Sequence, residues 1–72
     1  MIRPVRATEP ELSDEQLEVL RLFAAGLTVP AVARHTGLSS RTVCRRTRSA
    51  CDQLGVGTLI EAVAWAARRG LI

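Results

Sequence analysis

Hydroxyl residues that can cap a helix alternate along this chain with glycines that can end one. A capping serine or threonine accepts a hydrogen bond from a free backbone N–H group, and glycine adopts the left-handed conformation in which many helices end. These signals predict four helices, bounded by residues 13–26, 28–37, 39–55 and 58–69. Because no segment alternates apolar and polar residues for long enough to form a strand, we expect an all-α fold, a four-helix bundle.

Apolar residues in each predicted helix recur on one face, which indicates a shared core. In the third helix this face holds Val43, Thr47, Ala50 and Leu54. In the fourth helix we expect the inner face to hold Leu59, Val63, Ala66 and Gly70, with Trp65 pointing away. A chain of 72 residues makes one domain at most. We place this domain at residues 12–72, after a flexible lead-in or linker stub at residues 1–11 that contains two prolines.

The charges of the sequence are unevenly distributed. All ten basic residues are arginines, and the net charge is +3. Residues 1–20 carry two arginines and five acidic residues, a balance of −3, whereas residues 21–72 carry eight arginines and two acidic residues, a balance of +6. A basic part of this kind favours an anionic partner.

The reactive residues are too few for catalysis or for a metal site. Cys44 and Cys51 lie seven positions apart, which on one helix is about 10 Å, too far for a disulfide. With one histidine in the chain, cysteine and histidine cannot supply the ligands of a zinc site. We therefore expect no enzyme, metal, cofactor or small-molecule ligand. Reduced thiols and the lack of a long apolar run predict a cytoplasmic protein that does not enter a membrane.

Helices two and three, joined by Gly37-Leu38-Ser39, have the spacing of a helix-turn-helix. At about 100° per residue, the third helix presents Arg41, Arg45 and Arg48 on the face opposite its apolar residues. An α-helix fits the major groove of B-DNA, where arginine binds guanine O6 and N7 together. The pattern predicts base contacts from these arginines. Contacts with phosphates are predicted from residues near the two helix starts and beside the arginine face, namely Thr28, Ser39, Ser40 and Arg46.

Short segments spread over the whole predicted domain together form a recognisable pattern. They are Leu12-Ser13, Glu18-Val19-Leu20, Gly26-Leu27-Thr28, Val32-Ala33, Gly37-Leu38-Ser39, Thr42-Val43, Leu54-Gly55-Val56, Glu61-Ala62-Val63 and Arg69-Gly70-Leu71-Ile72. Together they resemble the LuxR-type (GerE-type) helix-turn-helix domain of NarL/FixJ-family regulators. The resemblance implies a bacterial transcription regulator, or its effector domain, whose third helix reads duplex DNA. It implies base contacts from Cys44, Arg45 and Arg48, and a phosphate contact from Thr42.

The resemblance also implies that the fourth helix mediates dimerisation on DNA. Small alanines would let a second helix approach closely, and tryptophan is common at the centre of protein interfaces. The residues predicted for a homodimer interface are Glu61, Ala62, Trp65 and Arg68. A symmetric pair would read two half-sites related by a twofold axis.

Two other functions compete with this interpretation. One is a module like region 4 of a sigma factor, which shares the turn motif. The other is a small protein-interaction module that keeps the fold but binds or sequesters a regulator, which Pro30 and Cys44 support because both are unusual in a DNA-reading domain. The acidic residues between positions 9 and 18 could also form a contact with RNA polymerase or with a regulatory protein.

Overall fold

A computed structural model describes residues 11–72, which form four helices without strands. In chain order these are α1 (Asp14–Ala24), α2 (Val29–Thr36), α3 (Ser40–Leu54) and α4 (Leu59–Arg68). The prediction of an all-α fold is confirmed for this range. The expected flexible lead-in lies outside the described residues except for Glu11. No helix between residues 11 and 72 is long and apolar enough to cross a lipid bilayer.

Each helix starts at the hydroxyl residue predicted to cap it. A backbone N–H group three positions on donates to the side chain of each cap residue: Ser13, Thr28, Ser39 and Thr58. In α1 and α4 the side chain at the third helical position also accepts a hydrogen bond from the N–H group of the cap residue. These capping boxes are complete within four residues of chain, so local sequence alone is enough to start both helices.

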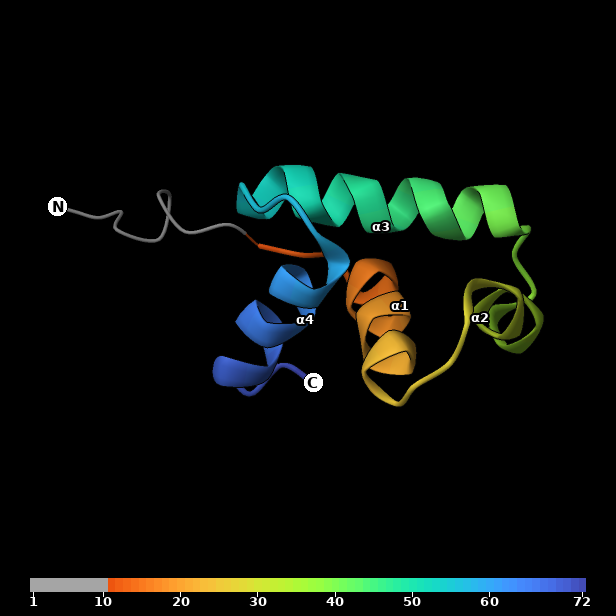
Figure 1. Ribbon diagram of the computed structural model, residues 1–72, viewed down its shortest axis with the longest axis horizontal. Helices are drawn as coiled ribbons and strands as arrows, with labels where there is room; N and C mark the ends of the chain where they lie inside the picture. The colour runs from red at the N-terminus through yellow and green to blue at the C-terminus, as the bar shows by residue number, and fades with distance from the viewer. Residues whose placement is uncertain (1–10) are drawn as a thin grey trace, which may run out of the picture.

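Helix α3 lies across the other three helices, and α1 lies between α2 and α4 (Figure 1). The core accordingly has two parts. Between α1, α2 and α3 lie Val19, Val32, Ala33 and Val43, and between α1, α3 and α4 lie Leu20, Cys51, Ala62 and Ala66. Neighbouring residues on a helix point about 100° apart. Val19 of α1 therefore packs in the first part of the core and Leu20 in the second.

The inner face of α4 differs from the predicted one. Ala62 and Ala66 are completely buried, whereas Gly70 is exposed and lies beyond the helix with a φ of +71°. Trp65 is half-buried and packs against the second core part, so the prediction that it points away from the core is wrong. The small side chain of alanine lets α4 lie close against α1 and α3, and this close approach covers Ala62.

Candidate nucleic-acid interface

The turn between α2 and α3 sets the direction of α3. Gly37 ends α2 in the left-handed conformation with a φ of 79°, and its N–H group donates to Ala33 O. Leu38 packs against the first core part, and Ser39 caps α3. The Thr36 hydroxyl donates to Val32 O at 2.8 Å and accepts from the N–H group of Leu38 at 3.3 Å. These contacts form the helix-turn-helix that the sequence predicts.

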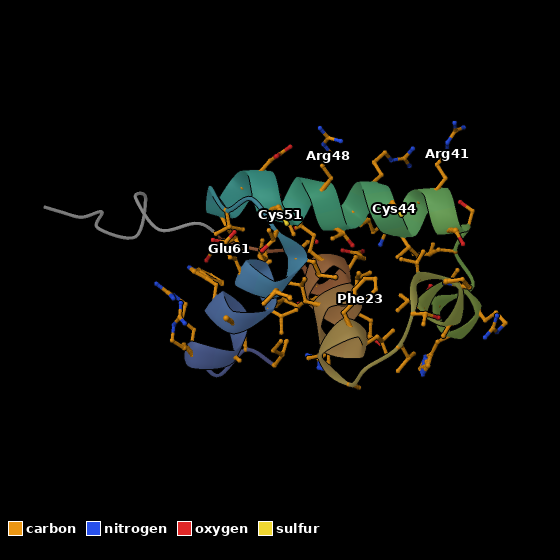
Figure 2. The ribbon with its side chains drawn as sticks, viewed as in Figure 1. Phe23, Arg41, Cys44, Arg48, Cys51 and Glu61 are labelled. Atoms are coloured by element: carbon orange, nitrogen blue, oxygen red, sulfur yellow. The ribbon has the colours of Figure 1, made fainter. Side chains whose placement is uncertain are left out.

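Arg41, Arg45 and Arg48 are all exposed on α3. Figure 2 shows Arg41 and Arg48 pointing away from α1, α2 and α4. We call these three residues the arginine stripe. A single ion pair within 4.0 Å occurs in residues 11–72, between Arg21 and Glu18, so the Arg48–Asp52 pair that their spacing allows is not formed. The stripe therefore keeps its positive charge free of intramolecular carboxylates within the described chain.

The opposite side of α3 is fixed to the core. Val43 and Ala50 have no exposed surface, and Cys51 is 9% exposed. Near the end of α3, the Gln16 Nε2 group of α1 donates to Gln53 Oε1 at 2.6 Å and to Ser49 Oγ at 3.3 Å. Gln16 lies three positions after the cap residue Ser13, the spacing of a capping box, and local sequence indicates no other role for it. These cross-helix bonds were missed because nothing in the local pattern shows that residues more than 30 positions apart will meet.

Three of the residues predicted to contact phosphates take part in helix capping. The Ser39 hydroxyl accepts from the N–H group of Thr42 at 3.1 Å and donates to Thr42 Oγ1 at 3.0 Å. Thr28 Oγ1 accepts from the N–H group of Ala31 at 3.3 Å. Ser40, the first residue of α3, is exposed beside these caps. The two helix starts thus hold their hydroxyl groups beside backbone N–H groups, which favours an anion.

Arg46 is half-buried at the junction between α3 and α1, outside the arginine stripe. It lines two hollows there together with acidic residues of the first turns of α1, namely Asp14, Glu15 and Glu18. Nearby carboxylates offset part of the arginine's attraction for an anion. Arg46 is therefore a weaker candidate for a phosphate contact than the sequence suggests.

Cys44 is exposed and lines a hollow that it shares with Phe23, Val29 and Cys51. Arg48 and Asp52 line the same hollow, so Cys44 lies at the edge of the arginine stripe. The Cys51 thiol lies within 3.5 Å of Thr58 O. Burial raises the pKa of Cys51, and the carboxylates of Asp52 and Glu61 raise it further, so this thiol stays protonated.

The four residues predicted at a dimer interface differ in their exposure and in their contacts within the domain. Ala62 is completely buried in its own core, so its prediction as a contact with a second copy is wrong. The Glu61 carboxylate is exposed but accepts hydrogen bonds from the N–H groups of Gly57 at 2.9 Å and Thr58 at 3.0 Å. Trp65 is half-buried beneath Arg69, whose guanidinium carbon lies 4.3 Å from the ring centroid.

Arg68 is exposed, as is Ile60, an apolar residue of α4 that the sequence analysis did not single out. Ile60 keeps 79% of its surface exposed, and a single exposed apolar side chain is ordinary on a protein surface.

Comparison with known proteins matches residues 11–56 to the homeodomain-like domain. These residues include α1, the turn motif and all of α3. The chain belongs to the homeodomain-like domain family. This homeodomain-like domain is also 36% identical over 64 residues to "Transcriptional regulatory protein YdfI" of Bacillus subtilis (strain 168). That alignment covers 89% of the chain and 30% of the relative, so the chain spans about a third of the length of that protein.

Proposed function

We propose that this domain binds duplex DNA with α3 in the major groove. The observation that carries the proposal is the arginine stripe, whose residues are exposed and without an ion-pair partner in the described chain. From Arg41 to Arg48 the helix advances about 10 Å, the length of roughly three base pairs. Arg45 and Arg48 are the principal base contacts in this proposal, with Arg41 and Cys44 beside them. Ser39, Ser40, Thr42 and Thr28 contact the phosphates, with a smaller contribution from Arg46.

We further propose that the domain is the DNA-binding part of a bacterial transcription regulator of the LuxR type, acting in the cytoplasm. Membership of the homeodomain-like family supports DNA binding, and the printed name of the relative supports transcription regulation. The similarity covers 30% of that relative, so it concerns the DNA-binding part and not the signal or the partners of a whole regulator. RNA polymerase or a regulatory protein remains a candidate partner for the acidic start of α1.

A salt titration with one pair of variants tests DNA binding. Binding should weaken steeply as salt rises, since several phosphates are neutralised. We expect Arg45→Ala to lose about 1–3 kcal/mol of binding free energy on the best site and to relax base preference there. Arg21→Ala, which removes the same charge from an exposed residue of α1, should change affinity little. Absence of duplex binding even at low salt, with a protein partner still bound, would instead establish the interaction module.

Dimerisation through α4 is the second part of the proposal, with Trp65, Glu61 and Arg68 in the interface. Arg68 gives the cleaner test because it is exposed, whereas Trp65 also stabilises the core. We expect Arg68→Glu to weaken binding to a duplex with two half-sites and to leave binding to a single half-site nearly unchanged. Equal affinity of both proteins for the paired half-sites would remove α4 from the interface.

A further inference from the structure

We infer that the DNA site of this domain is rich in guanine, and that adenine contributes little to its recognition. This inference rests on the proposed function, because it concerns which bases the exposed face of α3 can distinguish. Each base pair presents its own pattern of donors and acceptors in the major groove. The side chains that are free on α3 therefore limit which patterns the domain can read.

Adenine is usually read by a carboxamide, which accepts from N6 and donates to N7. The chain has no asparagine, and its two glutamines are Gln16 and Gln53. These two are bonded to each other, with Gln16 Nε2 donating to Gln53 Oε1 at 2.6 Å. Gln16 Oε1 accepts from the N–H group of Ser13 at 2.8 Å, and Gln53 Nε2 donates to Glu11 O at 2.9 Å. The described structure thus keeps both carboxamides occupied within the protein.

Most hydroxyl groups of α3 are also engaged within the protein. Thr42 accepts from Ser39, Thr47 donates to Val43 O at 3.0 Å, and Ser49 accepts from Gln16. The thiol of Cys44 is a weak donor and a weak acceptor. Ser40, Thr42 and Ser49 each keep an O–H donor, but serine and threonine hydroxyls contact different bases without strong preference. The groups of α3 that can specify a base therefore belong to the arginine stripe and to Asp52.

The arginine stripe and Asp52 match the two bases of a G·C pair. A guanidinium group donates two parallel hydrogen bonds to guanine O6 and N7, a geometry that adenine and thymine do not offer. Asp52 is exposed four residues after Arg48, and a carboxylate accepts from cytosine N4. Steps of three and four residues along α3 correspond to about 4.5 and 6 Å, so successive side chains reach base pairs that are one or two steps apart.

Selection of bound sequences from random duplexes, followed by competition with modified guanines, tests the inference on the whole chain. A guanine analogue with carbon in place of N7 loses one acceptor in the major groove, and inosine keeps N7 and O6 but loses the amino group in the minor groove. We expect the first analogue to weaken binding about five- to tenfold at each guanine contacted by arginine. Inosine at the same position should leave affinity nearly unchanged.

A pair of variants ties the preference to the arginine stripe. Arg45→Gln introduces a free carboxamide and should shift the preference at one base pair from guanine towards adenine. Arg21→Gln, an exposed substitution on α1 with the same loss of charge, should keep the original preference. Selected sites rich in A·T pairs, or tight binding that tolerates loss of guanine N7, would overturn the inference and leave DNA binding intact. Failure to bind any duplex would overturn both the inference and the proposed function.

Discussion

Replacing Gln16 by leucine removes three hydrogen bonds at the junction of α1 and α3. The side chain is 92% buried by its neighbours, as only 8% of its surface is exposed. Its Oε1 accepts from the N–H group of Ser13 at 2.8 Å, and its Nε2 donates to Gln53 Oε1 at 2.6 Å and to Ser49 Oγ at 3.3 Å. Leucine is of similar size but can form none of these bonds.

The expected cost follows from the surroundings of the three partners. A net contribution of about 1 kcal/mol for each bond gives about 3 kcal/mol, from which the apolar burial of leucine recovers part. Ser13, Ser49 and Gln53 are exposed, so water can satisfy the groups left behind. We therefore expect the free energy of unfolding to fall by about 2 kcal/mol, and the melting temperature to fall by roughly 8–16 °C for a domain of this size.

Thermal and urea unfolding followed by far-UV circular dichroism measure this loss. Gln53→Ala serves as the matched variant, because it removes one of the same bonds from the α3 side. The double variant should lose about 1 kcal/mol less than the sum of the two single variants, since both remove the shared bond. A Gln16→Leu protein as stable as the parent, or fully additive losses, would refute the assigned role of this side chain.

The other predictions concern local features of the fold. Gly37→Ala should cost about 1 kcal/mol because φ is 79° there, whereas Gly57→Ala, whose added Cβ would meet Glu61 Oε1 at an ordinary 3.7 Å, should cost less; urea unfolding compares the two. Hydrogen bonds from Gly57 and Thr58 lower the pKa of Glu61. Its stabilising contribution is therefore present above the ordinary value of 4.5 and lost as the pH falls through the lower folded value, a dependence that melting curves across acid pH should find reduced in Glu61→Gln. A thiol reagent should modify exposed Cys44 quickly and buried Cys51 slowly, and equal rates measured by mass spectrometry would contradict the structure.

Local signals in the sequence were sufficient for the helices and for the arginine stripe. The four capping residues and the glycine ends act within a few residues of chain, so their effect does not depend on the rest of the fold. The same holds for Arg41, Arg45 and Arg48, because a helix of known start and period places them on one side. Their exposure also followed, since uncompensated arginines are rarely buried.

The docking of the helices decided what the periodicity of α4 could not. An alanine can face a neighbouring helix or the solvent at little cost, so the sequence allowed Ala62 to be assigned to a dimer surface although it is buried. Trp65 has a large apolar ring with a polar edge, which suits both the core and an interface. Only the close approach of α4 to α1 and α3 settled which side of the helix is covered.

Polar side chains show the same division between sequence and tertiary structure. The sequence determined that Gln16 would close a capping box, because that bond spans three residues. Its bonds to Ser49 and Gln53 span more than 30 residues and exist because α1 and α3 pack against each other. Short-range hydrogen bonds can thus be read from residue order, whereas burial and long-range bonds depend on which surfaces meet when the helices pack.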